Sequence, residues 1–191
     1  RMVLKNYKDY PVHFLNHIKN FGLDQKSDID LNYEPSPYIS SPTDLSWSEI
    51  SLPWMSYGYG VNLTPLQTLT FYNAIANNGV RISPILVTHY IDEGDTIPLN
   101  RKFINNKKIC SQETLKKAKQ ILRNVVTEGT AKKINDVSTN VSGKTGTTVT
   151  NYDSKNAVTK TYQSSFVGFF PSEKPKYSCL VLVDNPDPEK G

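Results

Sequence analysis

The sequence has few cysteines and no long apolar run. Only Cys110 and Cys179 occur in 191 residues, which excludes a small disulfide-stapled protein and a cysteine-rich zinc module. The two thiols could pair, but cysteines this far apart in sequence are more often independent. The longest apolar runs, such as residues 180–183, are short, whereas a helix needs about 20 apolar residues to span a bilayer. No membrane segment is therefore predicted within the chain.

The sequence also has only a small excess of positive over negative charge. The sequence has 22 Lys and Arg against 18 Asp and Glu, a net charge of +4, which gives little reason to expect nucleic-acid binding. The basic stretch 101–119 predicts a solvated face, because no aromatic platform lies among its lysines. His13 and His17 stand four residues apart, but no third ligand follows nearby, so neither a metal site nor a cofactor is predicted.

The first half of the chain predicts two helices separated by a long loop. Residues 10–21 have apolar side chains at helical spacing and precede Gly22, a typical C-cap. Residues 23–53 contain four prolines among Ser, Asp and Asn, which indicates a long loop excursion. Thr64 as N-cap and Pro65 at the first helical position predict a helix that ends at Asn78-Gly79. Residues 83–91 then predict a strand, with a turn at 93–95.

The second half predicts a helix followed by three strands. The helix begins at Ser111, a good N-cap, and ends near Gly129. Its predicted apolar stripe consists of Leu115, Ala118, Ile121, Leu122, Val125 and Val126. Residues 140–149, 162–170 and 177–184 are the predicted strands, and the short links between them favour an antiparallel sheet packed against helices. The predicted fold class is α+β.

The segment from Ser142 to Thr148 is the sharpest chemical signal. Its Gly-Lys-Thr triplet matches the end of a phosphate-binding loop. Such a loop needs a glycine five residues before Gly143, where Ser138 stands, and a helix directly after the triplet. Strand-like residues follow instead, so the sequence disfavours nucleotide binding.

The same segment contains K-T-G, an element of serine acyl-transferases. Lys144 offers a cation for a substrate carboxylate and for tuning proton transfer. Gly146 allows an extended substrate to approach the strand closely. Thr145 and Thr147 offer hydroxyls to the same carboxylate, and the Thr147 N–H is suited to stabilise an oxyanion. A lone K-T-G triplet is more often a polar strand end with a flexible glycine, so the neighbouring sequence decides between these interpretations.

Further segments accompany K-T-G in a fixed order. They are Tyr57-Gly58-Tyr59-Gly60 with Thr64-Pro65-Leu66-Gln67, residues 73–79 (NAIANNG), Val125-Val126 with Gly129-Thr130-Ala131, and residues 165–171 (SFVGFFP) with 177–184 and Pro186. The ordered set, from about residue 14 to residue 186, resembles the transpeptidase domain of class B penicillin-binding proteins, particularly the division-type and sporulation-type enzymes.

The resemblance implies a partial serine β-lactamase/transpeptidase-like fold and a role in cell-wall synthesis. The longer parent would cross-link peptidoglycan by D,D-transpeptidation, with its catalytic domain in the periplasm or on the extracytoplasmic face of a membrane to which a single segment anchors it. Expected partners are peptidoglycan stem peptides, β-lactams and cell-division or elongation proteins, without nucleic acid. Lys144, Thr145, Gly146 and Thr147 would be the catalytic residues of this chain, with Lys144, Thr145 and Thr147 binding the substrate. No cofactor or metal is implied.

The chain also departs from the family pattern. It contains no S-x-x-K, so the nucleophilic serine is absent. S-x-N occurs at residues 138–140 and 154–156, but both lie beside K-T-G rather than well upstream of it, so we interpret both as coincidences. We therefore expect residues 1–191 to be part of a transpeptidase domain, without its upstream S-x-x-K and S-x-N region and its C-terminal helix, and inactive alone. The alternative is a non-catalytic relative that binds peptides or partner proteins.

Overall fold

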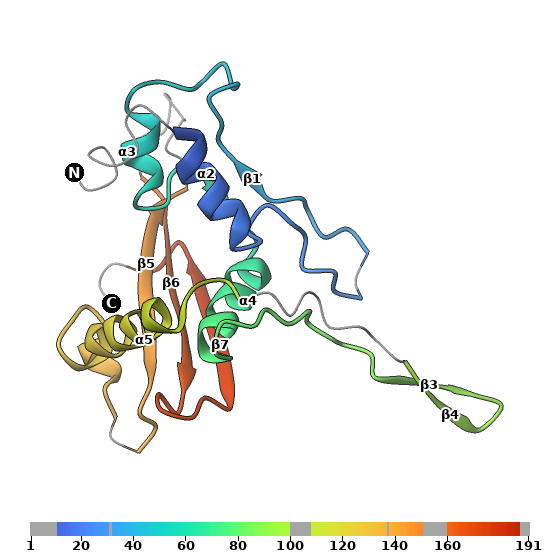
Figure 1. The fold of residues 1–191 in the computed structure, drawn as a ribbon. Coiled ribbons are helices and arrows are strands. Elements are labelled where there is room, and N and C mark those ends of the chain that lie inside the picture. The colour runs from blue at the N-terminus through green and yellow to red at the C-terminus, as the bar shows by residue number, and fades with distance from the viewer. Residues whose placement is uncertain (1–10, 31, 100–107, 137, 151–159, 188–191) are drawn as a thin grey trace. The chain divides into compact units, whose positions relative to one another are not determined.

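The computed structural model describes residues 11–30, 32–99, 108–136, 138–150 and 160–187. The chain divides into two compact units, which are Arg1–Phe71 with Val80–Cys110 and Tyr72–Gly79 with Ser111–Gly191. Helix α4 (Pro65–Ala76) contributes residues to both units (Figure 1). Within the described ranges, no helix is long and apolar enough to cross a membrane.

The first unit contains short helices and two small antiparallel sheets. Its elements are α2 (Pro11–Asn20), β1 (Tyr38–Ile39), α3 (Ser51–Met55), β2 (Val61–Asn62), the start of α4, β3 (His89–Asp92) and β4 (Asp95–Pro98). Strand β1 pairs with β2, and β3 pairs with β4. The buried apolar side chains are Leu15, Leu52 and Met55. Helix α2 ends just before Gly22, which has a φ of 73°, so the predicted first helix and its glycine stop are confirmed.

Helix α4 begins with a reciprocal pair of capping bonds. The Gln67 N–H donates to Thr64 Oγ1 at 3.1 Å, and the Thr64 N–H donates to Gln67 Oε1 at 2.8 Å. Each bond satisfies a backbone donor that the first helical turn leaves without an intrahelical partner. The predicted cap at Thr64 and start at Pro65 are confirmed.

Glu34 joins the irregular segment before α3 to the start of α4. The Ser27 N–H donates to both carboxylate oxygens, at 2.8 and 3.0 Å, and Gln67 Nε2 donates to Oε1 at 3.0 Å. Burial opposes ionisation of this carboxyl, but the hydrogen bonds from Ser27 and Gln67 outweigh it and lower the pKa of Glu34. A segment with little secondary structure is thus held in place by a charged acceptor.

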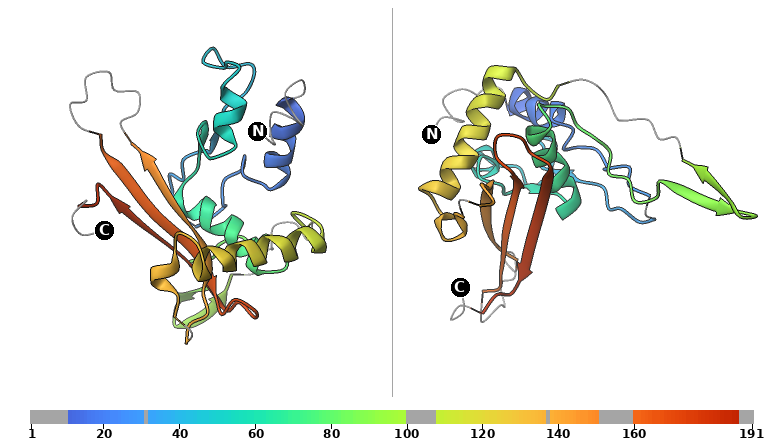
Figure 2. Two further views of the ribbon diagram at one scale, coloured as in Figure 1. Left: turned by 90° about the vertical axis from the view of Figure 1, so that its left-hand side faces the viewer. Right: turned by 90° about the horizontal axis from the view of Figure 1, so that it is seen from below.

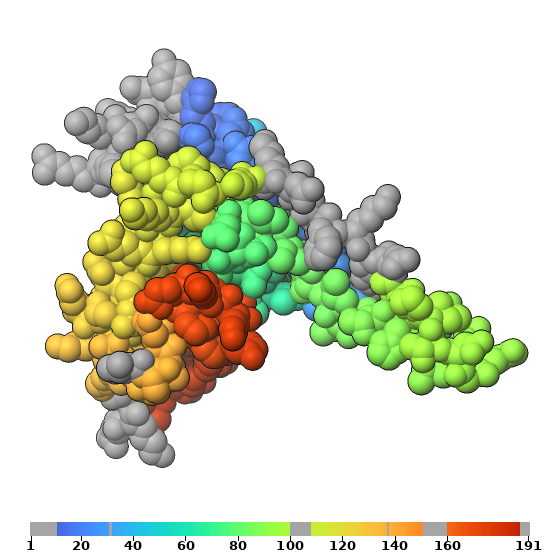
Figure 3. All heavy atoms as spheres, turned by 60° about the horizontal axis from the view of Figure 1, so that its bottom comes forward, coloured from blue at the N-terminus to red at the C-terminus, as the bar shows by residue number. Residues whose placement is uncertain are grey.

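Two parts of the first unit differ from the sequence prediction. The predicted strand 83–91 was wrong over residues 83–88, because regular pairing begins only at His89. Glu93 and Gly94 both have positive φ, of 48° and 93°, and this two-residue turn sets the register of β3 against β4. The hairpin strands, drawn in light green in Figure 3, have exposed side chains on their surface. Ile97 is the one half-buried residue of the two strands. Helix α3 was not predicted, because five residues are too few to show helical periodicity.

The second unit is a three-stranded sheet covered by a helix. After the end of α4 its elements are α5 (Gln112–Thr127), η1 (Lys132–Ile134), β5 (Ser142–Val149), β6 (Tyr162–Phe170) and β7 (Tyr177–Asp184). The strands are antiparallel in the order β5-β6-β7, and α5 lies across the sheet (Figure 2). Ser111 caps α5 by accepting the Thr114 N–H at 3.2 Å. The predicted α+β class, the helix and the three strands are confirmed.

The core of the second unit lies between α5 and one face of the sheet. Leu115, Leu122 and Val126 are buried on α5, and Val167 and Phe169 are buried on β6. Two bonds tie the end of α4 to the same unit, from Asn73 Nδ2 to Ser178 Oγ at 3.0 Å and from Lys119 Nζ to the Ala76 carbonyl at 3.1 Å. The predicted stripe on α5 was wrong at Ile121, which is 63% exposed. One residue corresponds to about 100° around a helix, so Ile121 is turned away from its buried neighbour Leu122.

A pair of glycines faces each other across strands β5 and β6. Gly143 lies directly opposite Gly168. A Cβ at Gly143 would lie 2.5 Å from the Val167 carbonyl oxygen, 3.0 Å from the Gly168 Cα, and in contact with the Phe166 ring. Phe166 therefore occupies the space that a side chain at Gly143 would need, and the backbone around it leaves no room for adjustment.

Gly143→Ala should lower the stability of the sheet, by about 1–3 kcal/mol for an overpacked site. Gly146→Ala is the matched control on the same strand, because its Cβ would meet only Ser165 Oγ, at 2.7 Å, which rotation of the serine relieves. Urea unfolding of the two variants measures the difference. Equal unfolding midpoints would contradict the close approach at Gly143.

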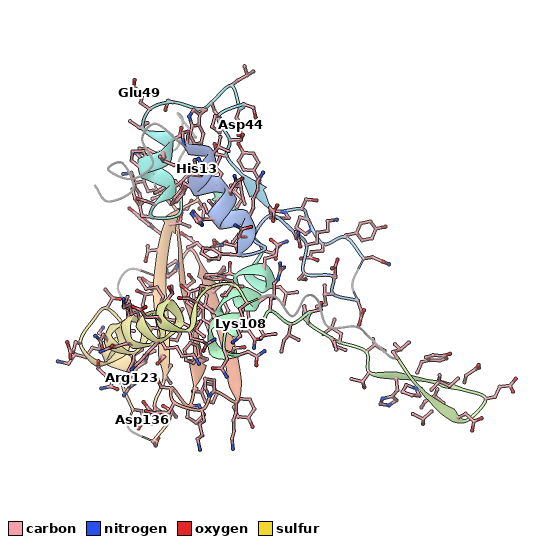
Figure 4. The ribbon with its side chains drawn as sticks, viewed as in Figure 1. His13, Asp44, Glu49, Lys108, Arg123 and Asp136 are labelled. Carbon is pink, nitrogen blue, oxygen red and sulfur yellow. The ribbon has the colours of Figure 1, made fainter. Side chains whose placement is uncertain are left out.

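Glu34→Gln should destabilise the first unit by about 1 kcal/mol at neutral pH, since charged hydrogen bonds are replaced by neutral ones at a partly exposed site. The pKa of Glu34 is lowered on folding, so its contribution is fully present above the unfolded pKa and is lost as pH falls through the lower, folded pKa. Urea midpoints at pH 7 and pH 3.5 test this, with the exposed Glu49 (Figure 4) changed to Gln as control. A wild-type-to-variant difference that is the same at both pH values would refute the role of the charge.

Candidate active site

The K-T-G residues lie on an edge strand. In the described sheet, β5 pairs with β6 on one side and with no strand on the other. Gly143, Lys144 and Thr145 are all inside β5, and the strand continues to Val149. A phosphate-binding loop requires a helix at this point, so the geometry excludes that interpretation of the triplet.

Alternation along β5 separates the four predicted site residues into two pairs. Lys144 and Gly146 belong to the face that contains the buried Val167, whereas Thr145 and Thr147 belong to the opposite face. Lys144 Nζ nevertheless donates to the Thr145 carbonyl at 2.7 Å and lies 3.4 Å from Thr145 Oγ1. The lysine side chain therefore bends around the free edge of β5, and its ammonium group lies beside the threonine hydroxyl.

The free edge of β5 presents backbone groups as well as side chains. The N–H and C=O of one residue point to the same side of a strand, and the side alternates from residue to residue. The Thr145 carbonyl accepts from Lys144 and so points away from β6. By the same alternation, the Thr147 N–H points to the free edge. The edge thus combines the Lys144 ammonium group, the hydroxyl of the half-buried Thr145 and the outward Thr147 N–H.

Gly146 lies between these groups and is exposed. A Cβ at this position would lie 2.7 Å from Ser165 Oγ on β6. A side chain here would thus crowd the sheet on the face opposite to the two threonines.

Two residues outside K-T-G support this edge. Arg123, on α5 (Figure 4), donates from Nη1 to the Val141 carbonyl at 2.7 Å, just before β5 begins. Thr130, in the turn after α5, has its Oγ1 2.7 Å from Thr145 Oγ1. Neither residue was predicted to belong to the site, because these bonds join positions 15 or more apart along the chain. The one sequence signal in this turn was the Gly129-Thr130-Ala131 triplet, which belongs to the ordered set of motifs.

The other sequence signals contribute no residue to β5. His13 and His17 are exposed on α2. Among the described residues, no group of three His, Cys, Asp or Glu side chains could hold a metal ion. The first S-x-N lies in a turn where the Ser138 N–H donates to Asp136 Oδ1 at 2.9 Å, and the second, 154–156, falls outside the described residues. Cys110 and Cys179 are both free thiols.

A comparison with protein families shows which family the chain belongs to. Residues 6–191 match the model of the penicillin-binding protein transpeptidase domain. The chain belongs to this family. The match includes α4, α5 and the whole K-T-G sheet, so the resemblance predicted from the ordered motifs is confirmed.

Individual relatives agree with the family assignment. Penicillin-binding protein H of Bacillus subtilis is 34% identical over 90% of the chain, and stage V sporulation protein D of the same organism is 31% identical over 89%. Penicillin-binding protein 3 of Mycobacterium tuberculosis in complex with ampicillin superimposes with a TM-score of 0.80 at 26% identity, over 92% of this chain and 40% of that one. The chain spans about a quarter of the length of the two Bacillus relatives, 25% and 26%.

Proposed function

We propose that this chain supplies the K-T-G part of the active site in a longer D,D-transpeptidase that cross-links peptidoglycan. The observation that carries the proposal is the edge of β5, where the Lys144 ammonium group and the Thr145 hydroxyl lie 3.4 Å apart beside unpaired backbone. A cation and a hydroxyl suit a carboxylate, and a free strand edge suits an extended peptide. A stem peptide that ends in D-Ala-D-Ala has both features.

The reaction proposed for the longer protein is an acyl transfer in two steps. A serine outside this chain attacks the carbonyl carbon of the penultimate D-Ala, the bond to the terminal D-Ala nitrogen breaks, and that D-Ala leaves as an amine with a proton. The amine of a neighbouring stem peptide then takes the acyl group from the serine. β-Lactams acylate the same serine through their strained amide. The family membership and the ampicillin complex of the mycobacterial relative support this proposal.

Each K-T-G residue has a separate role in this proposal. Lys144 and the hydroxyls of Thr145 and Thr147 bind the carboxylate of the substrate or drug. Gly146 leaves the strand accessible to the substrate backbone. The outward N–H of Thr147 stabilises the oxyanion that forms when the serine attacks. No metal or cofactor takes part.

The exposed face of the sheet supports the proposal that these 191 residues are only part of the catalytic domain. Tyr177, Val181 and Val183 are 62%, 54% and 48% exposed, and the register puts them on the same face as Phe166. Apolar side chains gathered on one face are normally covered. We propose that segments outside this chain cover them, in a parent anchored to the membrane with this domain on its extracytoplasmic side. Cell-division or elongation proteins are proposed partners of that parent.

A non-catalytic relative that binds peptides or partner proteins is the second candidate. The observation in its favour is that the 191 residues contain no S-x-x-K. The sequence that precedes Arg1 in the gene discriminates between the two candidates. S-x-x-K followed by S-x-N supports the enzyme, and their absence supports the binding protein.

Lys144→Ala in the full-length protein should slow acylation by benzylpenicillin about 100-fold or more, because a charged partner of the carboxylate is lost. Lys116→Ala, which removes an exposed lysine from α5, is the matched control and should leave the rate unchanged. Stopped-flow or fluorescent-penicillin competition gives the rate constants, and thermal unfolding checks the fold. Unchanged acylation of Lys144→Ala would remove this residue from the site.

The isolated 191-residue chain should retain no covalent label after incubation with a fluorescent penicillin and denaturation, because the proposed nucleophile is outside it. The full-length protein, treated in parallel, should be labelled. Gel fluorescence and intact mass measure the adduct. A stable adduct on the isolated chain would refute the proposal that its nucleophile lies elsewhere.

A further inference from the structure

The hydroxyl of Thr130 contacts a residue of the proposed site, although Thr130 itself lies outside K-T-G. Its Oγ1 lies 2.7 Å from Thr145 Oγ1, and both residues belong to the second unit. The Thr130 side chain is exposed, so burial does not explain a threonine at this position. The contact to the K-T-G hydroxyl is the interaction that distinguishes it from other exposed threonines.

The turn that carries Thr130 is fixed on both sides of it. A Cβ at Gly129 would lie 2.9 Å from the Val125 Cα and carbonyl oxygen, so the backbone passes too close to α5 for another residue. Ala131 is buried, and its N–H donates to the same Val125 carbonyl at 3.1 Å. The hydroxyl between them is therefore held at a defined place beside β5.

The number of hydrogen bonds that the Thr145 hydroxyl can make determines the effect of its contact with Thr130. A threonine hydroxyl has one proton to donate and two lone pairs to accept. Lys144 Nζ, which has no lone pair in its charged form, lies 3.4 Å from Thr145 Oγ1 and can only donate to it. If Thr130 also donates, both lone pairs are occupied and the Thr145 proton is left for a ligand.

We propose that Thr130 is a positioning residue that orients the Thr145 hydroxyl so that its proton points to the carboxylate of the substrate or β-lactam. This inference rests on the proposed function, because carboxylate binding by Thr145 is itself part of that proposal. Thr130 itself touches no reacting atom. Its effect should therefore depend on whether the ligand carries a free carboxylate.

The test compares acylation of the full-length protein by benzylpenicillin and by its methyl ester. Thr130→Val, which keeps the shape and removes the hydroxyl, should slow acylation by the acid about tenfold, as expected for one hydrogen bond to a charged group. The ester should be affected less than about twofold, because its carboxylate charge is absent. Thr130→Ser should restore the rate with the acid to within about twofold of the wild type.

The chain offers a matched control. Thr150 and Thr161 form another hydroxyl pair at 2.7 Å, joining the two strands beyond the end of β5. Thr150→Val removes the same kind of bond away from K-T-G and should change neither rate. If thermal unfolding shows that Thr130→Val is not folded, Thr130→Ala provides the same comparison, because it removes the hydroxyl and adds no atoms.

The outcomes separate the two proposals. Wild-type acylation together with an unaffected Thr130→Val variant would overturn the role of Thr130 alone. Equal slowing with acid and ester would also overturn it, because a merely structural effect does not depend on the carboxylate. A wild-type protein that neither ligand acylates would refute the proposed function and this role together.

Discussion

The pairing of β5 with β6 on one edge only is the constraint on which the rest of the site depends. Gly143 lies opposite Gly168, and Phe166 with the facing backbone leaves no room for a side chain at Gly143. Alternation from that register sends the backbone of Thr145 and Thr147 to the open edge. A slip of one residue would turn these groups toward β6 and the site would be lost.

Helix α5 and the turn that follows it hold this edge from outside the strand. Arg123 binds the carbonyl of Val141 before the strand begins, and Thr130 contacts the hydroxyl of Thr145 further along. Buried residues of α5 pack against the face of the sheet that contains Val167 and Phe169. This packing holds in place the helix from which the polar contacts come. The arrangement positions a cation and a hydroxyl without a metal-ligand cluster among the described residues.

Much of this architecture was predictable from local patterns. Ser111 and Thr64 are strong N-caps, and the three sheet strands have clear turn residues between them, so α4, α5 and β5–β7 follow from sequence. The start of β3 was missed because pairing in a hairpin is set by its turn rather than by apolar content. The contacts of Arg123 and Thr130 were missed because they depend on tertiary packing. No nucleophile was predicted within these residues because they contain no S-x-x-K.

A crystal structure of the full-length protein acylated by benzylpenicillin would test the proposed role of the β5 edge directly. We expect the drug carboxylate to lie within hydrogen-bonding distance of Lys144 Nζ and Thr145 Oγ1, with the acyl carbonyl oxygen near the Thr147 N–H. A drug bound covalently elsewhere, with the edge of β5 unoccupied, would contradict the claim that this edge forms the active site.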